Sequence, residues 1–594
     1  MAENQTENVV TETKIPMTTQ MYTTEDWWAI WLGGLILIAA LFASLAANPN
    51  VDSMYEYKAI MEREQEMAGF RTIAYTEAEA SFNAVRARNQ DGLLKTFHGW
   101  LATPARWSSN PLDSLYRSEA AAAEIRAANA QRLERATERL NEARAAAQAA
   151  EDLAREANFQ NTQLNQEARA LLGEWRSARS SHASARSAAN TQPFNRIPTL
   201  LGLMVVTALL FAIGGKFMNM NLKEYFIGFP IIFGLAVLSY VIANQETVRA
   251  YGFSYVLWGI VLGMLISNTV GTPKFLKTAA QTEYFIKTGL VLLGASILVN
   301  LILMVGLPGI FVTWVVTPIV LIGTYWFGQN VIKVESKQLN ITVSSDMSVS
   351  GVSAAIAAAA ASRAKKEELT LAIGMSMIFV VVMIFALPAF ANWVGMHPVW
   401  AGAWLGGTVD NTGSVVAAGE LIGPEAMYVA ATIKMIQNVM IGVMAFGVAA
   451  YWCLKVEPER ACAAGAAPMK FTAAGALSEI WYRFPKFILG FIGASIIMTL
   501  LAEARGEEWA YAMINNGVLA WANGLRGWFF AIAFVSIGLS ISYRELKEPL
   551  KGGKALILYV CGQSFNLMLT AFVAYIMFMV LFRDVTDRLM GMGL

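Results

Sequence analysis

Two small, polar, glycine-containing segments hold the residues of this sequence that are best suited to chemistry. Residues 344–362 read SSDMSVSGVSAAIAAAAAS, and residues 406–420 read GGTVDNTGSVVAAGE. Each segment contains one aspartate, Asp346 or Asp410, followed by a hydroxyl residue paired with glycine. Because lipid cannot hydrogen-bond a loosened backbone, such segments persist at membrane depth only where they are buried in protein or line a cavity. Paired interruptions of this kind indicate a transporter's binding site.

The hydroxyl–glycine steps predict a site for a small anion. A helix that begins inside the membrane points unpaired N–H groups and the positive end of its dipole at the gap. Hydroxyl groups add donors, and glycine lets a ligand approach the backbone. The alternative is that small residues only allow close helix packing, which we favour for the alanine run after Ser353. The residues predicted to bind substrate are Ser348, Ser350, Gly351, Ser353, Thr408, Asn411, Thr412, Gly413, Ser414 and Lys434.

Lys434 is the one positive charge predicted at this site. It lies inside an apolar helix, EAMYVAATIKMIQNVM, with Gln437 and Asn438 on the same face. We expect it to neutralise Asp410 or a bound anion, and the alternative is that its ammonium group reaches the membrane interface.

The aspartates of the two segments are predicted to couple transport to an ion. Ionisable residues inside a membrane are costly and are usually functional. Asp346 and Asp410 could carry H+ or coordinate Na+, although each could instead cap a half-helix. We expect no other cofactor and no metal centre.

Composition places the chain in the membrane. Of its 594 residues, 56% are hydrophobic and only 15% are charged, and the mean hydropathy is +0.44; soluble domains carry about 25% charge. Apolar stretches of about 20 residues, long enough to cross a bilayer, recur from Trp27 onward. The net charge of +1 gives no reason to expect nucleic acid. Nucleotide, dinucleotide, zinc-protease and nucleophile-elbow motifs are missing, so we do not expect an enzyme.

The predicted fold is an all-α polytopic membrane protein with inverted repeats and interrupted or re-entrant helices. It divides into a cytoplasmic tail (1–26), a first transmembrane helix (27–47), an extracytoplasmic helical insert (48–196) and a transporter membrane domain (197–594). Predicted spans of the membrane domain cover residues 198–214, 224–243, 252–270, 284–304, 308–327, 369–390, 425–452, 480–502, 527–543 and 555–582. Residues 515–527 form a third interrupted stretch. LGASI at residues 293–297 resembles IGLSI at 537–541, as a weak internal repeat would.

The insert is alanine-rich, with many Glu and Arg residues. This composition is typical of a coiled coil or helical hairpin, with a break near Asn158. We expect it to act as a spacer or to form a homo-oligomer, a dimer or larger.

Basic residues fall in alternate loops, and the loops predicted at 305–307 and 391–397 contain none. The positive-inside rule then places the N-terminus in the cytoplasm and the insert outside, in a bacterial inner membrane. Arg363, Lys365 and Lys366 obey the rule only if the first polar segment is re-entrant, so we favour that over a crossing.

Three stretches together resemble the YeiH-type family, whose members carry the label sulfate exporter: VSGVSAAIAAAAASRAKKEELTLAIGMSMIF, AAGELIG followed by AATIKMIQ, and AFVSIGLSISYREL. The resemblance covers the chain from Ile197 onward. It implies a fold of inverted repeats with interrupted helices, similar to cation/proton antiporters and bile-acid symporters, in which a core domain moves against a scaffold.

The residues that differ are those expected to contact substrate. This chain has Ser350-Gly351 where the family usually has Cys-Gly, alanines where it has Glu-Pro, and Asp410-Asn411 where it commonly has His-Glu. Lys434 matches the family, whereas the insert and the first span look foreign to it. Neither sulfate nor the direction of transport follows from the family label.

We therefore predict a secondary active transporter of a small anion: a sulfate-like oxyanion, an organosulfonate or a carboxylate. The alternatives are a membrane receptor or scaffold whose outer helices bind a partner, or an anion channel.

Overall fold

The computed structural model describes residue 10 and residues 15–46, 51–88, 93–296, 299–456, 478, 480–542 and 553–591. The described residues are almost all helical and contain one pair of two-residue strands. Among them, nine helical runs are long and apolar enough to cross a membrane: Glu25–Ala46, Ile197–Phe217, Leu222–Ala243, Ile302–Ile332, Lys366–Trp393, Pro424–Tyr451, Phe487–Arg505, Glu508–Ser540 and Lys554–Leu581. The chain is an all-α polytopic membrane protein.

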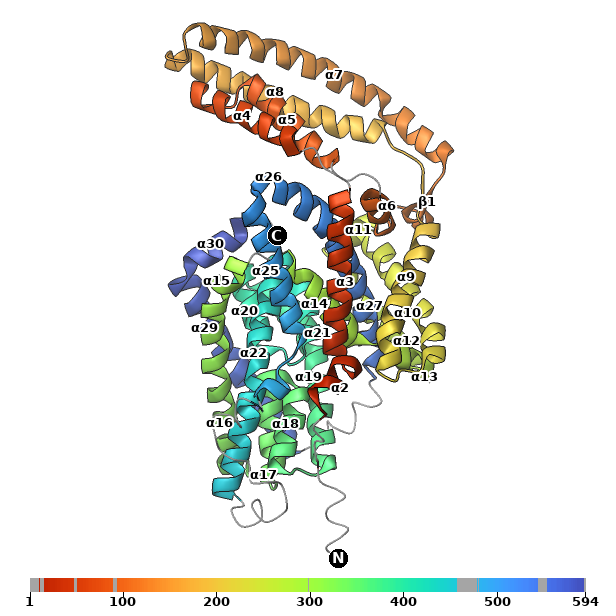
Figure 1. The fold of residues 1–594 in the computed structure, drawn as a ribbon, viewed down its shortest axis with the longest axis vertical. Coiled ribbons are helices and arrows are strands. Elements are labelled where there is room, and N and C mark those ends of the chain that lie inside the picture. Colours follow the sequence, from red (N-terminus) through yellow and green to blue (C-terminus); the bar gives the residue numbers. More distant parts are fainter. Residues whose placement is uncertain are drawn as a thin grey trace, which may run out of the picture.

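Helix α3 (Glu25–Ala46) connects the N-terminal segment to the insert. It follows the short α2 (Met17–Thr23) on the side of the N-terminus and leads to the insert at the opposite side (Figure 1). The N-terminal segment and the insert therefore lie on opposite sides of the membrane helices.

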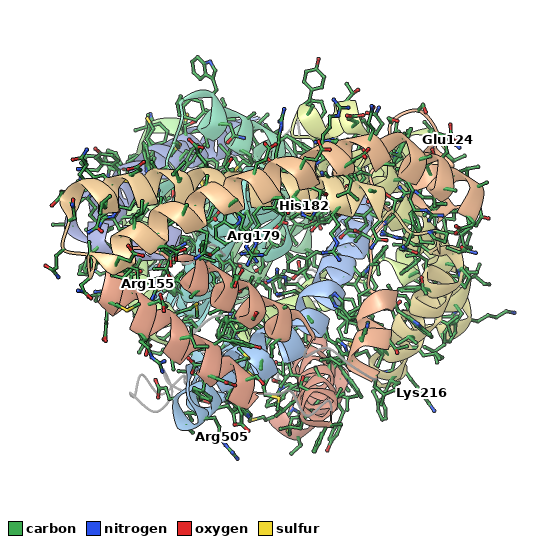
Figure 2. The ribbon with its side chains drawn as sticks, turned by 90° about the horizontal axis from the view of Figure 1, so that it is seen from above. Glu124, Arg155, Arg179, His182, Lys216 and Arg505 are labelled. Atoms are coloured by element: carbon green, nitrogen blue, oxygen red, sulfur yellow. The ribbon has the colours of Figure 1, made fainter. Side chains whose placement is uncertain are left out.

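The insert consists of two helical hairpins. These are α4 (Val51–Ala68) with α5 (Ile73–Arg88), and α7 (Glu119–Glu156) with α8 (Thr162–Ala189). The chain turns between α7 and α8 through Asn158 and Phe159, both with positive φ, where the sequence predicts a break. Seen from above, α7 and α8 lie across the membrane helices, and Arg179 of α8 donates a 3.1 Å hydrogen bond to the Thr76 carbonyl of α5 (Figure 2).

The insert is packed with small residues and closed by a strand pair at its base. Ala147, Ala154, Ala168 and Leu172 are fully buried, because alanine lets neighbouring helices approach closely. Strands β1 (Tyr116–Arg117) and β2 (Phe194–Asn195) pair antiparallel, so the α7–α8 hairpin leaves and rejoins the rest of the chain at one point.

The segment between the hairpins is anchored to the membrane domain by indole groups. It contains α6 (Leu93–Trp100) and the 3₁₀ turn η1 (Pro111–Ser114). The indole nitrogens of Trp521 and Trp528 donate to the carbonyls of Leu94 and Leu101 at 3.0 and 2.9 Å.

The remaining helices of the membrane domain form a bundle around the site. They are α9 (Ile197–Phe217), α10 (Leu222–Ala243), α11 (Glu246–Ala250), α12 (Tyr255–Thr269), α13 (Lys274–Ala279), α14 (Thr282–Gly294), α15 (Val299–Ile310), η2 (Phe311–Val315), α16 (Val316–Phe327), η3 (Gly328–Ile332), α19 (Lys366–Trp393), α22 (Pro424–Tyr451), η5 (Trp452–Val456), α25 (Phe487–Arg505), α26 (Glu507–Ala510), η6 (Tyr511–Val518), α27 (Leu519–Ser540), α29 (Lys554–Tyr575), η8 (Ile576–Leu581) and α30 (Arg583–Gly591). Backbones meet where α12 crosses α27: a Cβ added at Gly538 would lie 2.2 Å from the Ile260 carbonyl oxygen.

Two predicted interruptions are helical in the structure. The loop predicted at 305–307 lies within the helical run Val299–Ile332, which continues through Pro308, and the chain turns earlier, at Ala295 and Ser296. Membrane helices tolerate proline where neighbouring groups satisfy the freed carbonyl. Residues 515–527 are also helical, with π-type hydrogen bonding over Tyr511–Val518. Of the loops used to predict orientation, residues 457–477 and 543–552 lie outside the described residues.

Both polar segments fold back on themselves. Hairpin 1 consists of α17 (Lys337–Ser345), the π turn η4 (Asp346–Ser350) and α18 (Val352–Ser362), and its two arms pack against each other near the N-terminal side (Figure 1). The Ala364 carbonyl that follows it accepts a hydrogen bond from Val10 of the N-terminal segment at 3.0 Å. Hairpin 1 is therefore re-entrant, as favoured from the basic cluster.

Hairpin 2 enters from the other side. It consists of α20 (Pro398–Thr408) and α21 (Thr412–Ile422), and the helix that leads to it, α19, runs the full thickness of the bundle. The outer ends of both arms pack at the start of α22, since Gly402 meets Ala426 and Gly419 meets Met427. Two hairpins that enter from opposite sides are the arrangement expected of inverted repeats.

Candidate functional site

The tips of the two hairpins touch inside the bundle. Gly351, at the tip of hairpin 1, has φ 57° and ψ −128°, a conformation that residues with a Cβ rarely adopt. A Cβ added there would lie 3.1 Å from the Cβ and the carbonyl oxygen of Asp410 in hairpin 2. The glycine therefore permits both the turn and the contact between the tips.

Helix α22 satisfies the backbone groups that the broken tips leave unpaired. The Lys434 ammonium donates to the Val349 carbonyl at 2.9 Å and to the Gln437 side chain at 2.8 Å. The Gln437 amide donates to the carbonyls of Ser348 at 3.2 Å and Gly407 at 3.1 Å. The Gln437 side chain thus joins hairpin 1 to hairpin 2. Buried carbonyls that have no partner within a helix need such a donor from a side chain.

Helix α29 supplies a second set of polar groups, which sequence reasoning missed. Tyr559 donates to Asp410 Oδ2 at 2.6 Å, Gln563 to the Thr408 carbonyl at 3.0 Å, and Asn566 to the Met347 carbonyl at 2.9 Å. Their spacing of four and three residues, inside an otherwise apolar span, places them on one helix face. Polar residues at this spacing within an apolar span are the sequence signal that could have identified Tyr559, Gln563 and Asn566.

Asp346 lies behind the tips, fully buried. Neither of its carboxylate oxygens has a hydrogen-bond partner among the residues that the structure describes. Asp410 and Lys434 are close enough to interact with it electrostatically, and Ser376 and Tyr559 are neighbouring hydroxyls. Two carboxylates and one ammonium group, all buried, therefore share a site.

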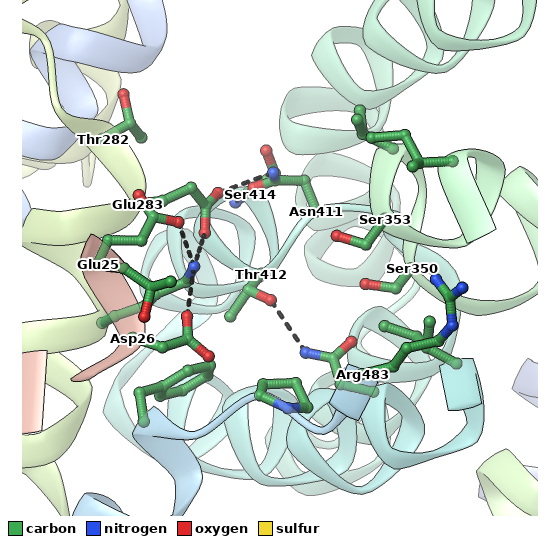
Figure 3. Close-up of a pocket in the computed structure, with 18 of the residues that line it drawn as sticks. Glu25, Asp26, Thr282, Glu283, Ser350, Ser353, Asn411, Thr412, Ser414 and Arg483 are labelled. Carbon is green, nitrogen blue, oxygen red and sulfur yellow. Dashed lines mark hydrogen bonds and ion pairs between the residues drawn. The ribbon is translucent and has the colours of Figure 1, made fainter. Parts of the chain in front are cut away.

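A cavity of about 960 Å³ extends from the hairpin tips toward the N-terminal segment, where Ile15 and Gln20 also line it. Five of the ten predicted substrate-binding residues line this cavity: Ser350, Ser353, Asn411, Thr412 and Ser414 (Figure 3). Hydroxyl groups predicted from both polar segments therefore line one cavity.

The other five predicted residues do not line it. The hydroxyls of Ser348 and Thr408 donate to carbonyls of their own segments, at Ser345 and Trp404. Lys434 is buried beneath the tip of hairpin 1. The two glycines, Gly351 and Gly413, lie in close packing contacts.

The two half-helices that begin at the tips differ in their caps. Asn411 accepts hydrogen bonds from the backbone N–H groups of Gly413 and Ser414 at 2.8 and 3.2 Å, so α21 is capped by a side chain. Helix α18 follows Gly351 and has no side-chain cap. The first N–H groups of α18 are therefore the better site for an anion.

The cavity contains more charge than the sequence predicted, and the expectation that Lys434 would be its one positive group is wrong. Lys287, Arg483 and Lys486 line it. The missed signal for Lys287 was its spacing of four residues from Glu283, at the start of an apolar span.

Lys287 is held in an ion-pair network. Its ammonium contacts Glu25, Asp26 at 2.9 Å and Glu283 at 3.8 Å. Glu283 in turn accepts a hydrogen bond from Asn411 at 2.9 Å, so the network reaches the tip of hairpin 2.

Fold and site together define a polytopic helical membrane protein of transporter-like architecture, with two re-entrant hairpins that meet at one cavity. The chain belongs to the family described as conserved hypothetical protein 698, whose model matches residues 227–559, and this is the YeiH-type family of UPF0324 membrane proteins. The matched region contains both hairpins, α22 and Tyr559. No solved structure matches the chain.

The relatives of this chain differ in how much of its length they match. A UPF0324 membrane protein of Nitratidesulfovibrio vulgaris is 48% identical over 99% of this chain and 100% of its own length. One of Rhodopirellula baltica is 42% identical over 95% of this chain and 91% of its own length. One of Nitrosomonas europaea is 29% identical over 61% of this chain and 79% of its own length. Because the first two match nearly end to end, they share the first span and the insert, whereas the family model begins at residue 227 and includes neither.

Proposed function

We propose that this protein is a secondary active transporter of a small anion, driven by a gradient of H+ or Na+ and working by alternating access. The observation that carries the proposal is the meeting of two re-entrant hairpin tips, from opposite sides, at one cavity. Midplane sites between interrupted helices are where secondary transporters bind substrate and coupling ion.

The anion would bind at the side of the cavity formed by hairpin 1. Ser350 and Ser353 present hydroxyl donors there, next to the uncapped N-terminus of α18. Arg483 lines the same cavity and supplies a positive charge. Donors, dipole and charge together suit a sulfate-like oxyanion, an organosulfonate or a carboxylate.

The coupling ion would bind at the pair of buried aspartates. Lys434 can balance one of the carboxylates, and a second unbalanced carboxylate at this depth would be costly. Among the described residues, the hydroxyls of Ser376 and Tyr559 lie near the Asp346 carboxylate, and neither makes a well-aligned hydrogen bond to it, so a proton or Na+ would supply a stronger partner. In this role Lys434 acts as counter-ion to the aspartates, and it supports the tip of hairpin 1.

The test is uptake by proteoliposomes containing the Asp346→Asn variant. Asparagine keeps the shape of the side chain but cannot exchange a proton, so uptake against a gradient should be lost while exchange of substrate across the membrane continues. Glu142→Gln, on the exposed surface of the insert, is the matched control. Concentrative uptake of sulfate, ethanesulfonate or acetate that is unchanged in Asp346→Asn would contradict the coupling role.

We place the protein in a bacterial inner membrane, with the N-terminus in the cytoplasm and the insert outside. The homo-oligomer stays a prediction. The buried small residues of α7 and α8 pack mainly against each other, and Ala68, Phe70 and Ile73 of the α4–α5 hairpin join the same core.

A further inference from the structure

The cavity is divided by charge. Figure 3 shows Glu25, Asp26 and Glu283 gathered at one side, with Ser350, Ser353 and Arg483 at the other. One side therefore offers hydrogen-bond acceptors and negative charge, and the other offers donors and positive charge. A ligand that spans the cavity meets both.

The acidic side retains negative charge after its internal pairing. Three carboxylates, those of Glu25, Asp26 and Glu283, face the ammonium group of Lys287. Lys486, whose backbone N–H donates to Asp26 at 2.7 Å, adds a second positive charge at this side. Three negative charges less two positive leave one. An acceptor-only anion such as sulfate would be repelled at this side.

A buried amide that lines the cavity also lacks a donor. Asn438 lines the cavity and is only 3% exposed. Its amide nitrogen donates to the Thr412 hydroxyl at 3.2 Å, whereas its Oδ1 has no hydrogen-bond partner among the described residues. A buried acceptor without a donor is costly, and a ligand that brings an N–H group would satisfy it.

We propose that the ligand is a zwitterion: a small organic sulfonate or carboxylate that also carries an ammonium group. The anionic group binds at Ser350, Ser353 and Arg483, and the ammonium group lies between Asn438 Oδ1 and the carboxylate of Glu283. This inference rests on the proposed function and narrows its substrate class. At about 960 Å³ the cavity has room for such an organic molecule.

The experiment compares matched probes on the detergent-solubilised full chain. Binding of 2-aminoethanesulfonate, ethanesulfonate, 3-aminopropanoate, propanoate and sulfate is measured by thermal stabilisation. We expect each amino compound to bind at least about tenfold more tightly than its partner without the amino group, because one satisfied buried acceptor and one ion pair exceed the 1.4 kcal/mol that a factor of ten represents.

Two variants test where the amino group binds. Glu283→Gln keeps an acceptor for Asn411 but removes the charge. Asn438→Leu removes the acceptor together with the hydrogen bond to Thr412. Each should abolish the preference for the amino compounds over their partners without the amino group, whereas Glu142→Gln should leave that preference unchanged.

The outcomes separate this inference from the proposed function. Equal binding within each probe pair, or a preference that survives both variants, would overturn the zwitterion and leave an anion transporter. Failure of all five probes to bind would count against both.

Discussion

The hydroxyl of Tyr559 and the carboxylate of Asp410 form the shortest described link between the helix α29 and the tip of hairpin 2, at 2.6 Å. Both groups are buried, and Asp410 also lies beside Asp346. Because water does not replace a lost donor at such a site, the bond has more influence on stability than an exposed one would.

Tyr559→Phe tests this link. Removing the donor leaves Asp410 Oδ2 unpaired, and we expect the free energy of unfolding to fall by about 1–3 kcal/mol, with weaker concentrative uptake. Tyr575→Phe is the matched control, because Tyr575 lies on the same helix and is 45% exposed. Thermal unfolding in detergent measures the stability of both variants. Equal stability of the two variants would show that the link contributes nothing.

At the scale of elements, the re-entrant hairpins depend on groups outside themselves. Hairpin 1 turns through a π segment and Gly351, and its freed carbonyls at Met347, Ser348 and Val349 are bound by Asn566, Gln437 and Lys434. The hairpin is thus formed jointly by its own glycine and by side chains of α22 and α29.

Gly351→Ala should disrupt the tip. The φ of +57° with ψ −128° costs a residue with a Cβ about 1–3 kcal/mol, and the added atom would also lie 3.1 Å from Asp410. We expect lower thermal stability and loss of uptake. The control is Gly493→Ala in α25, where no atom lies within 4 Å of the new Cβ. A Gly351→Ala variant with normal uptake would show that the tip tolerates a different turn.

At the scale of the molecule, the α7–α8 hairpin can be removed without stretching the chain. Arg117 and Phe194 face each other across the β1–β2 pair, so residues 118–193 can be replaced by Asn-Gly, which favours a two-residue hairpin turn. Phe70 and Ile73, which pack in the core of the insert, would be changed to Ser in the same variant.

This deletion distinguishes a transporter from a receptor whose outer helices are essential. The indole anchors at Leu94 and Leu101 remain, so we expect the membrane domain to fold and flux into proteoliposomes to continue. The untruncated chain carrying Glu142→Gln is the reference. A folded deletion variant without flux would favour the receptor.

The orientation of the whole chain is tested by cysteine labelling. Cys453, Cys462 and Cys561 are first replaced by Ser, and a single cysteine is then placed at Thr18 or at Ser180. Both positions are exposed, on opposite sides of the membrane helices. In intact cells a membrane-impermeant maleimide should label Ser180→Cys and leave Thr18→Cys unlabelled. The reverse pattern would invert the proposed topology.

The sequence alone determined the membrane class, most of the spanning helices and the two polar segments that form the site, because apolar length and runs of Gly, Ser and Asp are local properties. It misplaced the turn near residue 306, since proline inside a membrane helix resembles a loop signal when its neighbours are unknown.

Only the tertiary structure decided what surrounds those segments. Which hydroxyls face the cavity depends on how α18 and α21 rotate against their neighbours, and Lys434 lies beneath the tip because α22 passes there. The charges of Glu25, Lys287 and Arg483 come from three distant parts of the chain, which share one cavity. Contacts between residues so far apart follow from packing of the whole bundle, and no local pattern specifies them.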